Sequence, residues 1–373
     1  MTKEITHSQL KNILDVYFKS KMPLMVYGRF GIGKSYVIKE KAEELAKEQN
    51  KEFIEWNKIT EEKKNEVFKN NENYFVFIDI RLSEYDSTDI KGLPIFQENN
   101  RAIEFKTPFW ALLLEQEKSN GVLFFDEMNL ATPLVLSSCY KIIYDRIINN
   151  SKINDDWFIC SAGNLEEDRA YTHDLANPLR DRMGEVKLLT PNIDSFTDWS
   201  AKHNLDTRII AYLNFKSSSL YQVDEDDNQK FTTPRGWERV SNLIKGYTDF
   251  KQVDLLTSTA ISEGIAKEFT AFCKIADRLD IEDLIKNPSK IKDIKEIDVK
   301  YFLVSALSDK YINDKIDFKK VLEISEELDK GNNPEFVALL WKLSYGSKPS
   351  FKDDFLKNTD TDLINKYGKY LIE

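Results

Sequence analysis

Five short apolar runs alternate with helical segments in the first half of the chain. Each run is rich in Val, Ile, Phe or Tyr, as buried strands are. The runs cover residues 23–27, 74–80, 121–125, 157–160 and 186–189. Between them, segments such as 35–50 and 133–146 carry apolar residues at helical spacing. Because strands that alternate with helices form parallel sheets covered on both faces, the pattern predicts an α/β fold with a parallel five-stranded sheet.

The pattern changes near residue 190, after which the strand signal fades and apolar positions follow a helical period. Gly- and Pro-containing breaks at 287–288, 331–334 and 346–349 separate the later helices. We therefore expect an α/β core at 1–191, a small helical lid at 192–250 and a helical C-terminal region at 251–373.

Composition narrows the class of protein. The 373 residues include 53 Lys and Arg against 63 Asp and Glu, a net charge of −10, which disfavours a surface that coats nucleic acid. Cys139, Cys160 and Cys273 lie far apart, and the three histidines do not cluster, so neither disulfides nor a zinc site is expected. No apolar run reaches the 18 residues that a membrane span needs. These features predict a cytoplasmic protein without membrane contact.

A complete phosphate-binding motif, GxxxxGK[ST], follows the first run and precedes the first helix. Glycines let backbone N–H groups turn toward phosphate oxygens, and the helix start adds its positive dipole end. Lys34 would reach the β- and γ-phosphates, and the Ser35 hydroxyl would bind Mg²⁺. The candidate cofactor-binding residues are Gly28, Arg29, Phe30, Gly31, Ile32, Gly33, Lys34, Ser35 and Tyr36.

A second apolar strand, 122–125, ends in the carboxylates Asp126 and Glu127. Ligands bind open α/β sheets at the carboxyl ends of the strands. Asp126 can therefore complete the Mg²⁺ shell, while Glu127 can polarise an attacking water. A carboxylate pair at a strand end is weak evidence by itself. Behind an upstream phosphate loop it indicates a hydrolytic nucleotide site.

Further motifs follow the loop in a fixed order. They are Asp79-Ile80-Arg81-Leu82-Ser83, Asp89-Ile90-Lys91-Gly92-Leu93-Pro94, Phe125-Asp126-Glu127-Met128-Asn129, Ser161-Ala162-Gly163-Asn164, Asn177-Pro178-Leu179-Arg180-Asp181-Arg182 and Thr233-Pro234-Arg235-Gly236-Trp237. Together they resemble the MoxR-type AAA+ ATPases, a phage and bacterial lineage within the AAA group related to dynein and midasin. The resemblance covers about residues 23–272 and implies a P-loop NTPase core with a helical lid.

The resemblance also implies roles for single residues. Asn164 looks like the sensor 1 residue, which holds the attacking water or the γ-phosphate. Arg182 resembles the arginine finger that reaches the nucleotide of a neighbouring subunit, and Arg180, two positions away, stays an alternative. Arg235 resembles the sensor 2 arginine of the lid. Without the neighbouring motifs, these residues would be interpreted as a turn, surface salt bridges and an exposed helix start.

Two segments resemble family insertions. Residues 87–107 combine turn residues with an alternating apolar pattern, and 147–153 centre on an Asn-Asn turn, so both predict hairpins. In rings of this family such hairpins face the pore or a partner, although long surface loops would give the same pattern. The charged stretch 54–73 and the chain beyond about 281 match no part of the family.

The leading hypothesis is an ATPase that hydrolyses Mg²⁺-ATP in a ring and remodels or activates a protein client; the resemblance implies a hexamer. Relatives commonly work with a partner that carries a von Willebrand factor A domain. One alternative is a nucleotide-gated switch without significant turnover. Another is a nucleic-acid-translocating or GTP-dependent restriction-type ring. No residue distinguishes adenine from guanine, so ATP is an expectation from the family.

Overall fold

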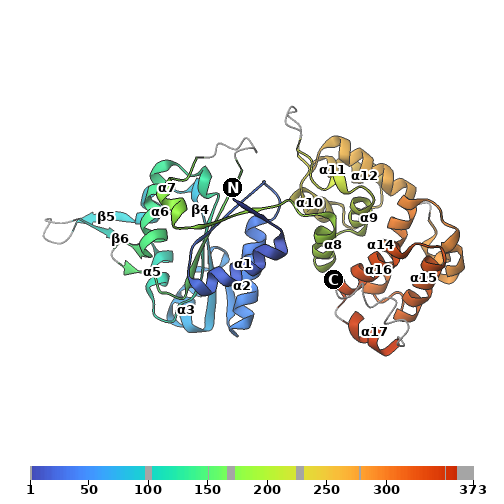
Figure 1. Ribbon diagram of the computed structural model, residues 1–373, viewed down its shortest axis with the longest axis horizontal. Coiled ribbons are helices and arrows are strands. Elements are labelled where there is room, and N and C mark those ends of the chain that lie inside the picture. Colours follow the sequence, from blue (N-terminus) through green and yellow to red (C-terminus); the bar gives the residue numbers. More distant parts are fainter. Residues whose placement is uncertain are drawn as a thin grey trace. The chain divides into compact units, whose positions relative to one another are not determined.

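The computed structural model describes residues 2–96, 103–149, 151–165, 173–223, 231–276, 279–348 and 350–358. The chain forms two compact units, Met1–Thr190 and Pro191–Glu373. The first unit contains the sheet, and the described part of the second is built from helices (Figure 1). The predicted α/β class with a parallel sheet and helices after it is confirmed.

The sheet has seven parallel strands in the order β1-β11-β2-β10-β7-β4-β3. Five of them correspond to the apolar runs. Their bounds are β2 Leu24–Gly28, β4 Tyr74–Arg81, β7 Gly121–Asp126, β10 Trp157–Gly163 and β11 Gly184–Leu188.

The prediction of five strands is wrong in number, because β1 (Lys3–Ile5) and β3 (Glu52–Glu55) add one strand at each edge. Both are short and partly exposed: β1 reads Lys-Glu-Ile, and β3 reads Glu-Phe-Ile-Glu with a charge at each end. Edge strands tolerate such charges, so they leave no apolar run in the sequence.

Alternate residues of the central strands face two different cores. On one face, Leu123 and Phe125 of β7 join a cluster with α5 (Phe109–Glu115) and α6 (Pro133–Asp145). On the other face, Phe124 stacks on Phe77 at 5.7 Å between ring centroids. That second face is covered by α1 (His7–Ser20) and α2 (Lys34–Glu48), and Phe18 of α1 contacts the Phe158 ring. The sheet is therefore buried on both sides, as its continuous apolar runs require.

The remaining elements of the first unit lie at its periphery. They are α3 Glu61–Lys69, α4 Ser87–Lys91 and α7 Asn177–Asp181, with hairpins β5 Leu93–Phe96 with β6 Ile103–Lys106 and β8 Ile147–Ile148 with β9 Ser151–Lys152. Residues 97–102 and 150, within the two predicted hairpin ranges, lie outside the described residues.

The β5–β6 hairpin exposes apolar side chains on both faces. Cross-strand partners share a face, so Pro94, Phe105, Phe96 and Ile103 form one side, with Phe96 at 71% exposure. Leu93 and Ile95 alternate with Lys106 and Glu104 on the other side. Its described strands thus present a concentrated apolar surface to solvent.

The second unit packs helices around one hydrophobic cluster that includes residues from α8 to α17. The helices are α8 Ile193–Lys202, α9 Thr207–Phe215, α10 Pro234–Ile244, α11 Phe250–Ser258, α12 Glu263–Ala276, α13 Ile281–Lys286, α14 Ile297–Ile312, α15 Phe318–Lys330, α16 Pro334–Ser347 and α17 Phe351–Asn358. The cluster spans both the predicted lid and the C-terminal region, and the boundary between them at 250 stays a prediction.

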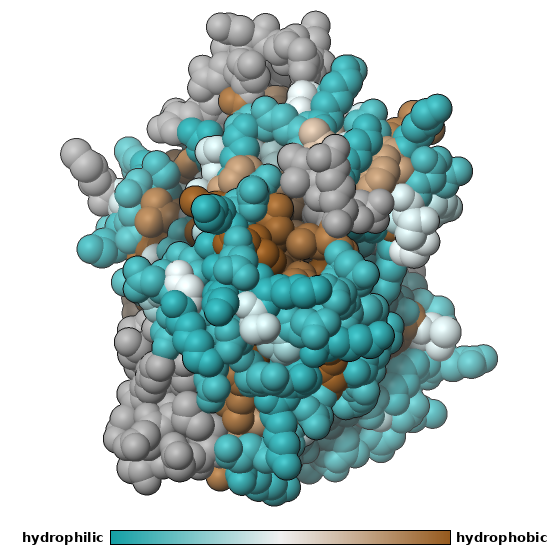
Figure 2. Space-filling view, turned by 90° about the vertical axis from the view of Figure 1, so that its right-hand side faces the viewer, coloured by the Kyte–Doolittle hydropathy of each residue, from teal (hydrophilic) through white to brown (hydrophobic). Residues whose placement is uncertain are grey.

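The molecular surface is largely hydrophilic on the face shown in Figure 2, with hydrophobic residues gathered near its centre. Among the described helices, none combines the length and the low polarity that a bilayer span requires.

Trp341 anchors the cluster of the second unit. Its side chain is fully buried, its indole N–H donates to Ser325 Oγ at 2.8 Å, and its ring contacts Phe351 and Phe355. We expect Trp341→Ala to lower the free energy of unfolding by about 3–5 kcal/mol through lost burial and a cavity. Urea unfolding followed by circular dichroism measures this change. Leu255→Ala, at a 67% exposed position, is the control and should cost under about 0.5 kcal/mol; equal losses in both variants would contradict the packing.

Candidate functional site

The phosphate loop has the backbone that its glycines predict. Gly31 and Gly33 have φ angles of 73° and 95°, in the left-handed region that L side chains rarely adopt. Gly33 is also the N-cap of α2, where no side chain caps the first turn. Backbone N–H groups at this helix start can therefore receive an anion.

Lys34 lies at the start of α2 and is 8% exposed. Its Nζ donates to Gly28 O at 2.7 Å, to Arg29 O at 2.9 Å and to Asn164 Oδ1 at 2.9 Å. These three acceptors are neutral. The ammonium group thus bridges the loop after β2 and the residue after β10, which is where a bound phosphate chain would meet it.

Ser35 and Asp126 contact each other directly. Ser35 Oγ donates to Asp126 Oδ2 at 2.9 Å, although 91 residues separate them. Mg²⁺ prefers oxygen ligands. The hydroxyl of Ser35 and the carboxylate of Asp126 are therefore suitable ligands for the ion, as predicted. Asp126 Oδ1 accepts from the Glu127 N–H at 2.9 Å, which fixes the carboxylate orientation.

Glu127 is held by two residues of the motif 79–83, to which the sequence analysis assigns no role. Its φ of 52° turns the chain sharply after β7. The Ser83 hydroxyl donates to Glu127 Oε2, and Arg81 Nε lies 4.0 Å from Oε1. Arg81, at the end of β4, pairs in register with Asp126 of β7. The end of β4 therefore lies next to Glu127, the residue after Asp126. In this state the predicted catalytic carboxylate is engaged within the chain.

Asn129 clamps the backbone of Asn164. Its Nδ2 donates to Asn164 O at 2.8 Å, and its Oδ1 accepts from the Asn164 N–H at 3.0 Å. Asn129 is only 4% exposed, and a Cβ at Gly163 would lie 2.6 Å from its Oδ1. The backbone O of Asn129 also accepts from the His173 N–H at 2.7 Å. Sequence reasoning placed Asn129 in a motif but missed this role, because only the fold brings the two amides together.

Asp79, which the sequence analysis quotes in a motif without a role, is a second such residue. It lies between the buried residues Ile78 and Ile80 of β4. Its Oδ1 is buried without a partner among the described residues, and the charge of Asp126 acts on it. Burial, reinforced by Asp126, raises its pKa to about 6. A carboxyl group inside the run YFVFIDIR was the available sequence signal.

The two candidate finger arginines have different partners. Arg180 forms a bidentate ion pair with Glu185: its Nε donates to Oε1 and its Nη2 donates to Oε2, each at 2.9 Å. This ion pair raises the pKa of Arg180. The guanidinium of Arg182 lies 3.8 Å from the centre of the Tyr144 ring, as a cation–π contact does. Both side chains are exposed. Glu185 thus pairs with Arg180 and not with Arg182.

Arg235 lies in the helical unit, in the first turn of α10, and is exposed. Thr233 caps that helix by accepting from the Gly236 N–H at 3.1 Å. The proposed contact of Arg235 with nucleotide stays a prediction. In the first unit, by contrast, the structure connects Lys34 with Asn164, and Ser35 with Asp126, whose neighbour is Glu127.

No protein-family model matches this chain, and no curated protein matches it. Similar solved structures include ORC2 of Aeropyrum pernix, with ADPNP and ADP, at 12% identity and a TM-score of 0.38 over 91% of this chain and 93% of that one. NtrX of Brucella abortus has 14% identity and a TM-score of 0.33 over 97% and 67% of the two chains. The RuvB branch migration motor of Thermotoga maritima has 12% and 0.30 over 97% and 94%. Similarity at this level carries no information on function.

The raised pKa of Asp79 predicts a pH dependence of stability. A folded-state pKa near 6, above the unfolded value of 3.8, means that the native state binds the extra proton between these values. Stability from this group is full below about pH 4 and is lost as pH rises through 6. Two pKa units are worth ~3 kcal/mol, which partial exposure reduces to ~1–2 kcal/mol.

We therefore expect Asp79→Asn to gain ~1–2 kcal/mol relative to the wild-type chain between pH 4 and pH 7. Urea unfolding at both pH values, without Mg²⁺, measures this difference. A difference that stays constant with pH would contradict the raised pKa. Asp155→Asn, at a solvent-exposed position outside the site, is the control.

Proposed function

We propose that this chain is a MoxR-type AAA+ ATPase that binds Mg²⁺-ATP in its first unit and hydrolyses it. The observation that carries the proposal is the pair of contacts that joins Lys34 to Asn164 and Ser35 to Asp126. Hydrolysis of a terminal phosphate requires three groups that this site contains. They are a phosphate loop after β2, an acidic residue at the end of β7, and a polar residue after β10, the strand between those two.

Each residue then has a distinct task. The loop N–H groups and Lys34 bind the phosphates, and Lys34 exchanges its carbonyl acceptors for phosphate oxygens. Ser35 and Asp126 would hold Mg²⁺, which neutralises charge on the phosphate oxygens when bound. Glu127 orients and deprotonates the attacking water, and Asn164 donates its amide N–H to that water or to the γ-phosphate.

Site completion depends on a second copy. We assign the arginine finger to Arg182, because its guanidinium rests on the Tyr144 ring and can move to a phosphate without breaking an ion pair. Arg180 would first have to leave Glu185. If each subunit supplies the finger to the site of its neighbour, the subunits form a ring. The resemblance favours six subunits.

The client and the partner follow from the resemblance. We propose a protein client and a partner with a von Willebrand factor A domain, in the cytoplasm. The net charge of −10 disfavours the nucleic-acid-translocating alternative. The nucleotide-gated switch has one observation in its favour, since Ser83 and Arg81 engage Glu127. Turnover would then begin only when those contacts are released.

Two variants test the nucleotide site. Lys34→Ala should abolish Mg²⁺-ATP binding by calorimetry, because it removes the cation between loop and phosphates. Glu127→Gln should keep binding but slow phosphate release by about 10²–10⁴-fold. Lys39→Ala is the control, since this lysine lies on α2 but pairs with Glu55. Normal affinity in the Lys34 variant would contradict the loop assignment.

The clamp on Asn164 predicts a kinetic signature. Asn129→Ala should lower kcat by about tenfold and leave KM nearly unchanged, because it misplaces Asn164 without removing a phosphate contact. Steady-state phosphate release measures both constants. Loss of binding with kcat retained would contradict this role, and Asn65→Ala on exposed α3 is the control.

Mixing experiments test the finger. Arg182→Ala should lose about 10³–10⁵-fold in rate, and Arg180→Ala far less. Mixed rings of Arg182→Ala with Glu127→Gln should recover activity, because one interface then carries both intact residues. Sedimentation velocity with ATP establishes that joint rings form. Joint rings without recovered activity would contradict a finger supplied by a neighbour.

A further inference from the structure

His7 contacts the phosphate loop from outside the loop. Its Nε2 lies 2.8 Å from Ile32 O, although 25 residues separate the two in sequence. A Cβ added at Gly33 would lie 3.8 Å from the same Nε2, so the imidazole ring lies beside the turn that leads into α2. In sequence His7 is an isolated histidine, and only the fold brings it to the loop.

The hydrogen bond between His7 and Ile32 has a defined direction. A carbonyl oxygen only accepts, so Nε2 of His7 carries a hydrogen and donates it. Burial lowers the pKa of His7, although the bond to Ile32 O and the charge of Glu40 oppose this shift. The ring is therefore mostly neutral above about pH 7 and brings no positive charge to the loop. Its effect on a bound anion must come through the geometry of the backbone.

Ile32 is fixed both at its side chain and at its carbonyl. Its side chain is 2% exposed, and a Cβ at Gly28 would lie 2.9 Å from its Cδ1. Its neighbours Gly31 and Gly33 have φ angles of 73° and 95°. Glycines restrict the backbone least, so they leave the peptide planes of the loop free to rotate. The bond from His7 restrains one of these planes.

The peptide bond between Ile32 and Gly33 transmits this restraint. The bond is trans and planar, so its C=O and N–H groups point in opposite directions. Because Ile32 O points toward His7, the Gly33 N–H points away from it. That N–H belongs to the start of α2, where backbone groups can receive an anion.

Helix α1 holds His7 in place. His7 is the first residue of α1, and Thr6 caps the helix. The Thr6 hydroxyl accepts from the Gln9 N–H at 3.3 Å, and the Thr6 N–H donates to Gln9 Oε1 at 2.9 Å. Figure 1 shows α1 beside α2, and Lys11 joins the two helices through an ion pair of 2.8 Å with Glu40. The donor to the loop is therefore carried by a capped helix that is anchored to α2.

We propose that His7 is a positioning residue of the phosphate loop, which turns the Gly33 N–H toward the bound phosphate chain by donating to Ile32 O. The loop then presents this N–H before nucleotide arrives, so binding does not lose the entropy of ordering it. The inference rests on the proposed nucleotide function of the loop. It adds a residue from outside the motif to those that determine affinity.

Three substitutions of His7 test this role when the full chain is titrated with Mg²⁺-ADP by calorimetry. His7→Ala removes the donor. His7→Gln places an amide N–H at the same number of bonds from Cα as Nε2, whereas the amide of His7→Asn is one bond shorter. We expect His7→Ala and His7→Asn to weaken ADP binding by about tenfold, and His7→Gln to stay within about threefold of wild type. Equal affinities in His7→Gln and His7→Asn would overturn the proposal.

A purely structural contact would give a different result. It would lower the thermal midpoint of the ligand-free chain, but the dissociation constant of ADP, measured well below that midpoint, would equal the wild-type value in all three variants. That outcome would overturn the positioning role.

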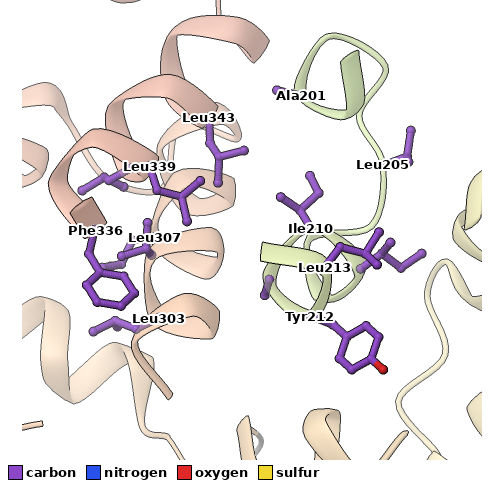
Figure 3. Packing of buried hydrophobic residues seen from close by; sticks show 14 of the residues in the cluster. Ala201, Leu205, Ile210, Tyr212, Leu213, Leu303, Leu307, Phe336, Leu339 and Leu343 are labelled. Carbon is purple, nitrogen blue, oxygen red and sulfur yellow. The ribbon is translucent and has the colours of Figure 1, made fainter. Parts of the chain in front are cut away.

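His203→Ala is the matched control. Nδ1 of His203 also bonds to a backbone carbonyl, that of Trp199, at 2.7 Å. His203 lies in the second unit, between Ala201 and Leu205, two residues of the hydrophobic cluster of that unit (Figure 3). This variant should leave ADP affinity unchanged. A loss as large as that of His7→Ala would overturn the assignment to the loop.

Inorganic pyrophosphate distinguishes the loop from the rest of the nucleotide site. It has no base and no ribose, so a role in the loop predicts that His7→Ala weakens Mg²⁺-pyrophosphate by the same factor as ADP. Displacement of ADP by pyrophosphate measures this constant. A loss for ADP alone would overturn the proposal and would place His7 against the nucleoside.

The two proposals fail separately. If Lys34→Ala abolishes ADP binding and the His7 variants keep wild-type affinity, the role of His7 alone is overturned. If the wild-type chain does not bind ADP, the nucleotide function is overturned, and the role of His7 with it.

Discussion

The place of β10 between β2 and β7 is the constraint on which the candidate site depends. All strands of the sheet run in parallel, so the residues after these three strands meet at one edge. Lys34 and Asn164 are 130 positions apart in sequence, yet they share a hydrogen bond there. The same edge places Asp126 against Ser35. A different strand order would separate the loop from Asn164 and Asp126, even if the glycines gave the loop the same local backbone conformation.

The sequence predicted the parts of the fold that local pattern controls. Five strands and the loop were predictable because a buried strand gives a run of apolar residues in the sequence and the loop gives a glycine-rich motif. The edge strands β1 and β3 were not, because solvent on one side lets charged residues replace apolar ones. The loop lies between β2 and α2, and Asp126 ends β7, as the pattern predicted. The chemistry of these residues with nucleotide is a proposal.

The roles of residues that act through tertiary contacts escaped prediction, even where a quoted motif contained the residue. Asn129 and Ser83 are ordinary polar residues in sequence, and only the fold shows that they hold Asn164 and Glu127. The choice between Arg180 and Arg182 was likewise open in sequence. It depends on Tyr144, which lies on α6 rather than beside either arginine in the chain. Side-chain partners of this kind follow from three-dimensional packing, which periodicity does not encode.

The β5–β6 hairpin has a consequence for the isolated chain in solution. A two-stranded ribbon is marginally stable by itself, and this one displays Phe96, Ile103 and Phe105 to water. Such a surface favours adhesion between molecules, while the net charge of −10 opposes it. Self-association of the chain should therefore increase with ionic strength, because added salt screens the charge repulsion between molecules and allows their apolar hairpins to contact one another.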